Sequence, residues 1–474
     1  MQRVSSLDAG MLYAETPEMP MHTLGVLILE RPPRSIFARL QRDIGSRLHL
    51  IEPFRRRLVE DPLRLGDPYW MEDPDFSLDN HLHRSAIRTP GGRRELAEFV
   101  GDLAGSLLDR AQPLWAMVLV EGLADGNAAL VVKVHHAAMD GGRLVAMMNT
   151  LLDLSAGGRR TIAALPERRP GQWPSAAWFA LDASRALVTR PFNALRALAD
   201  IGATLLRGAR SGSGKSIRAD KARLFAAPRT PFNGALSRQR SVAMADVAFA
   251  DVRKIRNAFG TTVNDVVLAA SGGALRDWLL RHAALPDQPL IASVPVTVRS
   301  AGGADDAAGN RVSMILTELP LQTDDPVQRL LAIRAQTAQA KVRHGRGKGD
   351  VFRQGTDLLT SITVPWLLTQ MIALYSRSDL GDRLPPLWNL VISNLPGPQR
   401  VLYCAGARVL RLYPFGPVQL NSGLNLTVMS SGTRLCLGEM ACGRMVPDVE
   451  LIADGFVREI RMLKKLAAHS TRQG

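Results

Sequence analysis

Cysteine is scarce in this chain, which has three cysteines in 474 residues. Cys404, Cys436 and Cys442 form no CxxC pair, and any disulfide scheme leaves one of them unpaired. This usage argues against a disulfide-stapled scaffold and favours a reducing compartment. Aromatic residues make up only 5% of the chain. Because no helix-turn-helix pattern, zinc-finger spacing or aromatic-rich RNA-binding strand accompanies them, we expect no nucleic-acid partner.

Long apolar runs are also missing. The longest, residues 358–376, is interrupted by Pro365, Gln370 and several threonines, so we expect no membrane-spanning helix. The first 20 residues carry acids and no apolar stretch, so we expect no signal peptide. Together with the cysteine usage, these features favour a cytoplasmic location.

Acidic residues are few relative to basic ones, 44 against 59, which gives a formal net charge of +15. The excess is concentrated in residues 157–240, which hold 16 Lys and Arg against 4 acids. Such a surplus predicts an anionic partner, either an anionic membrane or lipid-droplet surface or a phosphorylated cofactor. Apolar residues recur there at near-helical spacing between arginines, which is typical of a basic amphipathic helix that lies on lipid or packs on its own protein. These apolar residues are Trp178, Leu181, Leu195, Leu198, Ile201 and Leu205.

The length of the chain predicts two or three folding units. We expect an N-terminal part at 1–156, a basic crossover at 157–225 and a C-terminal part at 226–474. Hydrophobic periodicity supplies the elements. Strands are predicted at 21–29, 69–71, 116–121, 128–134, 291–298, 312–316, 387–393, 424–429 and 434–440, and helices at 36–50, 95–108, 266–280 (amphipathic) and 449–466.

The stretch HHAAMDG at residues 135–141 carries the most chemistry in the sequence. It follows a predicted strand, and successive strand side chains point to opposite faces. We therefore expect one of His135 and His136 to act on chemistry and the other to pack. Asp140 can fix the loop through an arginine or backbone amides, and Gly141 leaves room at the entrance of a cleft.

A neutral imidazole that titrates near pH 6.5 is suited to taking a proton from an alcohol as that alcohol attacks a carbonyl. The opposite directions of His135 and His136 argue against a zinc site, which needs imidazoles that converge and a third ligand. His81 and His83 have the spacing of one strand face, but no third ligand is near, so we interpret them as a solvated pair. No metal is expected.

Two further patterns bear on mechanism. Thr262-Val263-Asn264-Asp265 is typical of a capped helix start. A nucleophilic serine in a GxSxG turn is absent, and no cysteine is suitably placed. This favours direct transfer without an acyl-enzyme.

These residues resemble the bacterial wax ester synthase/diacylglycerol acyltransferase family, within the superfamily of CoA-dependent acyltransferases and peptide-synthetase condensation domains. HHxxxDG is shared by the superfamily, and its combination with PLW and ND in this order points to the narrower family. The resemblance runs nearly end to end. The matching residues are Ser6-Leu7-Asp8, Pro20-Met21-His22, Pro113-Leu114-Trp115, the stretch 135–141, Asn264-Asp265, Pro295 to Arg299 and Asn394 with Pro396-Gly397-Pro398.

The resemblance implies an α/β pseudo-dimer of two subdomains, each a mixed sheet flanked by helices, with a tunnel between the halves. It implies a fatty acyl-CoA donor, which is a substrate and not a cofactor, and a lipid alcohol acceptor. Diacylglycerol is the leading acceptor, which makes the chain a triacylglycerol synthase at a lipid surface. The residues Pro113, Leu114 and Trp115 are assigned to substrate binding.

Within this resemblance His136 is assigned as the general base, and His135 as support for the loop. Asp140 is expected to hold the loop through an ion pair, with Arg299 as a candidate partner. Asn264 is a candidate donor to the tetrahedral oxyanion, although a plain helix cap explains it equally well. Gly141 and Asp265 are expected to shape the loops around the site.

Other functions stay open from sequence. Wax ester synthesis on long-chain alcohols is the nearest alternative. Transfer to a small polar acceptor, as in condensation domains, is disfavoured because no carrier-protein module is present. The family usually has an Asp shortly before Val446-Pro447-Asp448, whereas this chain reads Ala441-Cys442-Gly443-Arg444. That departure keeps a catalytically silent, lipid-surface-binding relative in view.

Overall fold

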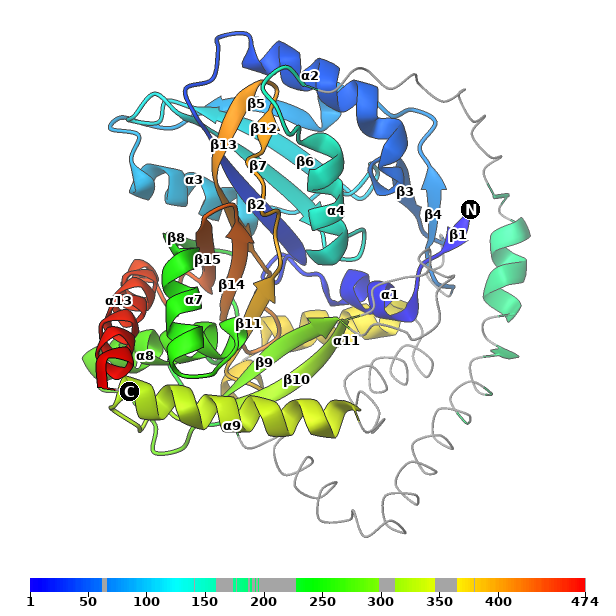
Figure 1. Ribbon diagram of the computed structural model, residues 1–474. Helices are drawn as coiled ribbons and strands as arrows, with labels where there is room; N and C mark the ends of the chain where they lie inside the picture. Colours follow the sequence, from blue (N-terminus) through cyan, green and yellow to red (C-terminus); the bar gives the residue numbers. More distant parts are fainter. Residues whose placement is uncertain are drawn as a thin grey trace.

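The computed structural model describes residues 1–61, 66–139, 141–158, 174–175, 177–185, 188–189, 192, 195, 227–297, 312–345, 365–378 and 380–473. Two six-stranded mixed sheets, each with helices packed on it, make up two halves, one above the other in Figure 1. This two-part α/β architecture confirms the predicted fold class.

The first sheet has the strand order β12-β13-β2-β7-β6-β5. The predicted strands 116–121 and 128–134 are found there as β6 (Trp115–Glu121) and β7 (Ala128–His135), which pair as an antiparallel hairpin. The connecting turn contains Gly126 at φ 75°, a left-handed conformation that favours glycine. β5 (Leu82–Ala86) runs parallel to β6, which makes the sheet mixed.

Two strands of this first sheet come from far along the chain. β13 (Ala407–Phe415) pairs antiparallel with β2 (His22–Leu29), and the two-residue β12 (Tyr403–Cys404) extends the edge. Figure 1 shows β13 in orange beside the blue β2. The chain thus returns to the first sheet after the boundary predicted near residue 226. The two sheets are therefore not built from two consecutive stretches of the sequence.

The second sheet has the order β10-β9-β11-β14-β15-β8. β11 (Leu390–Leu395) runs parallel to both of its neighbours, and β14 (Leu424–Ser431) forms an antiparallel hairpin with β15 (Arg434–Cys442). The other strands are β8 (Arg240–Ala248), β9 (Leu290–Thr297) and β10 (Val312–Leu319).

Helix α8 (Val263–Arg281) is the centre of the second half. It packs on α9 (Pro326–Gly345) and α13 (Glu450–Gln473) as well as on strands of the second sheet. The prediction of an amphipathic helix is wrong, because α8 is buried along nearly its whole length from Asp265 to Leu279. A helix that is covered on all sides loses the polar face that periodicity looks for.

The remaining elements cover the sheets and add a small third one. Apolar side chains of α2 (Ile36–Arg47) and α4 (Gly141–Leu151) pack on one face of the first sheet. A three-stranded sheet, order β1-β4-β3, lies near the N-terminus. The other elements are α1 (Ser6–Ala14), α3 (Arg93–Gly105), α7 (Phe249–Ala258), α11 (Pro365–Arg377), α12 (Leu380–Arg383), β1 (Gln2–Arg3), β3 (Arg56–Val59) and β4 (Tyr69–Glu72), with 3-10 turns at Leu48–Leu50, Glu52–Phe54 and Leu78–Asn80.

A shared apolar core joins the two halves. Side chains from β2 and β7, such as Val26 and Val131, meet side chains from β8 and β15, such as Met244 and Met440. Asp246 on β8 adds polar contacts to β13: it accepts a hydrogen bond from the Tyr413 hydroxyl at 3.1 Å and pairs with Arg411. The two halves therefore pack together as one unit.

The histidines before and within β5 differ from their prediction. His81 is buried, its Nδ1 donates to the Trp115 carbonyl at 2.9 Å, and its ring stacks on Trp115 with centroids 4.5 Å apart. His83 is exposed. The interpretation as a solvated pair is therefore wrong for His81, because the ring is a partner of the Trp115 indole in the core.

Candidate active site

The end of β7 is anchored on both sides by its neighbouring strands. The His135 amide donates to the Leu114 carbonyl at 2.9 Å, and the His136 amide donates to the Met21 carbonyl at 2.8 Å. His135 is the last residue of the strand, and His136 is the first residue of the turn that follows. Two of the sequence motifs, PLW and PMH, thus hold the backbone of the histidine pair.

The side chain of His135 is buried in the interior of the protein. Its exposed fraction is 0%, and strand alternation puts it on the same face of β7 as Val131 and Lys133. The Ala137 amide donates to His135 Nδ1 at 3.0 Å, so the proton of the neutral ring lies on Nε2. That Nε2 faces Glu15 Oε1 at 3.4 Å. Both ring nitrogens of His135 therefore face groups of the protein interior.

His136 differs from its neighbour in exposure. Its side chain is half-buried, on the turn between β7 and α4. Gly141 is the first residue of α4. Asp140 and Arg299, the predicted ion pair, lie outside the described residues. The structure thus gives the histidine pair one fully buried and one half-buried ring.

Behind His135 lies a buried acid with two histidines and an arginine around it. Glu15 Oε1 is 3.0 Å from His22 Nε2, and Glu15 Oε2 is 3.0 Å from Arg110 Nη2. His22 lies directly opposite His135 in the register of β2 and β7, and its exposed fraction is 1%. The donor atoms of Glu15, His22 and His135 all lie within 4.8 Å of one another, which is also a spacing that a metal ion could use.

The electrostatics of this cluster follow from burial and pairing. Burial alone would raise the pKa of Glu15, but its contacts with His135 and His22 outweigh burial and hold that pKa well below its usual range. Burial lowers the pKa of His22 to about 4, and burial lowers the pKa of Lys133 to about 8. At neutral pH the cluster therefore contains an ionised carboxylate and a neutral His22.

The residues of the PLW motif form part of the core. Leu114 and Trp115 are 1% and 2% exposed. The Trp115 indole donates to the Phe54 carbonyl at 2.9 Å and stacks on the Phe54 ring with centroids 4.2 Å apart. The contacts in the structure give this motif a packing role beside the histidine pair, and its assignment to substrate binding stays a prediction.

Asn264 lies in the first turn of α8, in the second half of the molecule. The cap of this helix is made by Thr262 and Asp265: the Asp265 amide donates to Thr262 Oγ1 at 3.2 Å, and the Thr262 amide donates to Asp265 Oδ2 at 2.8 Å. Asp265 Oδ1 also accepts from the Thr337 hydroxyl at 2.7 Å. Asn264 is half-buried and is not itself the cap, so the capping explanation does not account for it.

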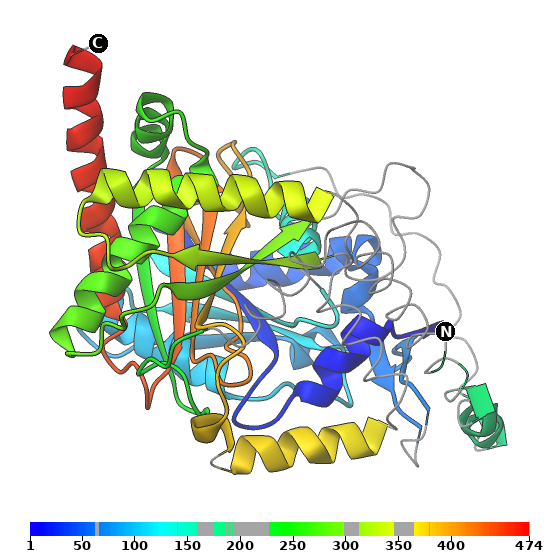
Figure 2. The same cartoon turned by 90° about the horizontal axis from the view of Figure 1, so that it is seen from below.

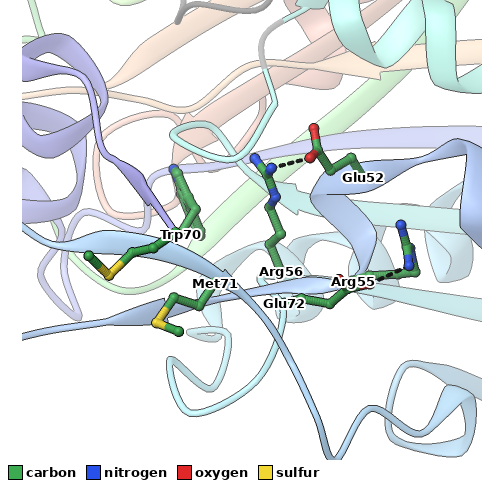
Figure 3. A pocket seen from close by; sticks show the side chains of 7 residues that line it. Glu52, Arg55, Arg56, Trp70, Met71 and Glu72 are labelled. Carbon is green, nitrogen blue, oxygen red and sulfur yellow. Dashed lines mark hydrogen bonds and ion pairs between the residues drawn. The ribbon is translucent and has the colours of Figure 1, made fainter. Parts of the chain in front are cut away.

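A separate surface pocket of about 140 Å³ lies on the small third sheet (Figure 3). Its two arginines are each paired with an acid, Arg55 with Glu72 and Arg56 with Glu52. The charges balance, and none of the residues that line it belongs to the predicted site. The pocket therefore offers no evidence for a second binding site.

Sequence reasoning missed the buried position of Glu15 beside the two histidines and gave His22 no role beyond the resemblance. Glu15 lies 120 residues before His135 and shares no motif with it. The available signal was a histidine at the start of an otherwise apolar strand with an acid just before that strand. Pairing of that strand with β7 could not be read from local sequence.

Comparisons with known proteins agree with this arrangement. A model of the wax ester synthase/diacylglycerol acyltransferase catalytic domain matches residues 4–267, and a model of the WS/DGAT C-terminal domain matches residues 308–464. A putative diacylglycerol O-acyltransferase of Mycobacterium tuberculosis is 36% identical, with 98% of this chain and 90% of the relative covered. A probable diacylglycerol O-acyltransferase of the same organism is 33% identical, with 94% of each chain covered.

Solved structures give the same result. A wax ester synthase/diacylglycerol acyltransferase from Marinobacter aquaeolei VT8 superposes with a TM-score of 0.69 at 28% identity, covering 99% of this chain and 100% of that one. The first condensation domain of the CDA synthetase shares the fold alone, with a TM-score of 0.59 at 17% identity over 98% and 96% of the two chains. The chain therefore belongs to the wax ester synthase/diacylglycerol acyltransferase family.

Proposed function

We propose that this protein transfers a fatty acyl group from acyl-CoA to the free hydroxyl of diacylglycerol, which makes triacylglycerol. The observation that carries the proposal is the contrast between the two histidines: His135 is fully buried, with Nδ1 bonded to the Ala137 amide and Nε2 turned toward Glu15, whereas His136 is half-buried on the turn. Several relatives are named diacylglycerol O-acyltransferases, which favours this acceptor.

The chemical step assigned to His136 is general-base catalysis. Its imidazole takes the proton of the acceptor hydroxyl while that oxygen attacks the thioester carbonyl. The tetrahedral intermediate then expels the CoA sulfur, which receives the proton from the imidazolium. Base assistance of this kind contributes about 10²- to 10⁴-fold. Asn264 is proposed as a donor to the oxyanion, and Asp140 with Arg299 as the pair that holds the loop.

The acceptor can be tested with purified protein, palmitoyl-CoA and either diolein or hexadecanol. We expect CoA release with diolein to exceed that with hexadecanol, and thin-layer separation to show triacylglycerol. Preference for hexadecanol, with wax ester as the product, would replace the proposal by the nearest alternative. No CoA release with either acceptor would favour the silent relative.

Direct transfer has a separate test. After incubation with palmitoyl-CoA and no acceptor, intact-protein mass spectrometry should find only the unmodified mass. An added palmitoyl group would show that an acyl-enzyme forms, in spite of the missing serine motif. The three cysteines, all buried and unpaired, are the residues to examine first in that event.

We also propose that the protein works at a lipid surface, with α11 as a contact. Within the residues described, none of the helices combines the length and apolarity that a bilayer crossing needs. However, α11 presents Leu367, Met371 and Leu374 at helical spacing, with exposed fractions of 38%, 54% and 67%, and Trp366 beside them. Leu368 of the same helix packs into the core of the first half, and α11 lies next to α1 (Figure 2). An apolar face of this kind can enter a membrane interface.

Vesicle flotation tests this contact. Met371→Asp with Leu374→Asp should reduce binding to anionic vesicles, and wild type should bind anionic vesicles better than neutral ones at low salt. Met462→Asp on α13, where Met462 is also 45% exposed, is the matched control. Equal flotation of the double variant and wild type would remove α11 from the proposal. The basic segment 157–225 lies mostly outside the described residues, and Leu181 and Leu195 within it are exposed.

A further inference from the structure

We propose that Glu15 is a positioning residue for acyl transfer: its carboxylate holds His135 in a single tautomer and orientation, and through His135 it fixes the turn that presents His136. The proposal rests on the proposed role of His136 as the base. Glu15 touches neither the donor nor the acceptor in this view and acts only through His135.

Glu15 is placed for this role by three elements. It is the C-cap residue of α1, and its side chain turns inward to the ends of β2 and β7. One oxygen, Oε1, faces His22 Nε2 at 3.0 Å and His135 Nε2 at 3.4 Å. The other, Oε2, accepts from Arg110 Nη2 at 3.0 Å and from Arg110 Nε at 3.2 Å. Each oxygen therefore has its own set of partners.

A carboxylate is required by the donors that converge on it. Because the Ala137 amide occupies His135 Nδ1, the His135 proton lies on Nε2 and points at Glu15. The guanidinium of Arg110 compensates the buried negative charge, which would otherwise be costly. Arg110 is itself held by the Leu12 carbonyl at 2.6 Å and by Glu60 at 3.2 Å. A glutamine at position 15 would place an N–H group against the N–H groups of Arg110 or of the histidines, where an acceptor is needed.

The link from Glu15 to the turn is short. His135 Nδ1 receives the Ala137 amide, and the His135 carbonyl receives the Ala138 amide at 2.9 Å and the Met139 amide at 3.3 Å. A rotation of the His135 ring would break the first of these bonds. The turn that starts at His136 would then lose one of its anchors, and small displacements of a catalytic group can cost about 10²-fold in rate.

The same three residues could be taken for a metal site, since their donor atoms have suitable spacing. The charges argue against it. Arg110 already binds the carboxylate, and the buried Lys133 ammonium donates to the Leu103 and Ser106 carbonyls nearby on the same face of β7. A divalent ion would add two positive charges to a buried region in which Glu15 is already neutralised. A proton-holding network is the better account.

The central test is Glu15→Gln, with Glu60→Gln as the matched control on the same arginine. We expect Glu15→Gln to lower kcat by about 10- to 100-fold with the KM for palmitoyl-CoA changed by less than about 3-fold. Glu60→Gln should keep kcat within about 3-fold of wild type. Glu15→Asp, which restores the charge, should recover part of the lost kcat. A Glu15→Gln protein that is folded and has the wild-type kcat would overturn the proposal.

A second readout does not depend on acyl transfer and is taken on the wild-type protein. In wild-type protein with ¹⁵N-labelled histidine, the His135 signals, assigned by their loss in His135→Gln, should report a proton on Nε2 and none on Nδ1. A proton on Nδ1 would refute the proposal even if diacylglycerol acylation is correct. If acylation fails but this tautomer is found, only the proposed function is at fault. Stoichiometric zinc in the purified protein, lost on chelation, would replace the proton network by a metal site.

Discussion

At the scale of single residues, Glu439 is in an unusual environment. It lies on β15 among apolar neighbours of the second core, and its exposed fraction is 0%. Neither of its side-chain oxygens has a hydrogen-bond partner among the described residues. Burial, with a smaller contribution from the charge of Asp454, raises the pKa of Glu439 well above its usual value. Burial thus favours the neutral form of the Glu439 carboxyl in the folded protein.

We predict that Glu439→Met increases the free energy of unfolding by about 1–3 kcal/mol at pH 7 to 8. The sign follows from linkage: a carboxyl whose folded pKa is raised contributes stability below its unfolded pKa, near 4.5, and loses it as pH rises toward the folded pKa. The gain should therefore shrink when unfolding is measured near pH 4. Urea unfolding of both proteins across this range checks the prediction, and a gain that does not change with pH would contradict it.

The site could be predicted from sequence only as far as local periodicity reaches. Strand alternation correctly predicts that the side chains of His135 and His136 differ in burial, because that rule depends on local geometry alone. It cannot supply Glu15, since the contact requires α1, β2 and β7 to meet in space. Trp115 shows the same limit: the motif was found, but its packing on Phe54 and His81 depends on segments elsewhere in the chain.

At the scale of elements, two residues at the start of α8 allow helix capping and catalysis to be tested separately. Thr262→Ala removes the cap and should lower the free energy of unfolding by about 0.5–2 kcal/mol, with kcat of the folded protein nearly unchanged. Asn264→Ala removes no cap contact and should lower kcat by about 10²- to 10³-fold with little change in stability. Thermal unfolding and CoA release measured on both variants check the pair. The reverse pattern would show that Asn264 is structural.

Helix α8 also shows why the position of an element in the sequence is easier to predict than its burial. The capping box at Thr262 correctly predicts where the helix begins, because that signal is local. The expected polar face is missing, because α9 and α13 come from later in the chain to cover it. Helix positions thus follow from sequence, while burial on all sides follows from topology.

At the scale of the whole molecule, the close approach of β13 and β15 ties the halves together. A Cβ added at Gly438 would lie 1.9 Å from the Pro414 carbonyl oxygen, so only glycine fits. We predict that Gly438→Ala costs about 3 kcal/mol of stability or prevents folding. Gly157→Ala, where an added Cβ has no atom within 4 Å, is the control. Equal unfolding midpoints for the two variants would contradict this view of the interface.

This contact could not be foreseen, because sequence order suggested that the chain after residue 226 builds only the second half. β13 instead joins β2, and with Asp246 it links both sheets.

The turnover of His136→Ala tests the central claim most directly. We predict that CoA release from palmitoyl-CoA with diolein falls by about 10²- to 10⁴-fold, while the unfolding temperature stays close to that of wild type because the ring is half-buried. Near-normal turnover of His136→Ala, together with loss of turnover in His135→Ala, would show that the base has been assigned to the wrong histidine.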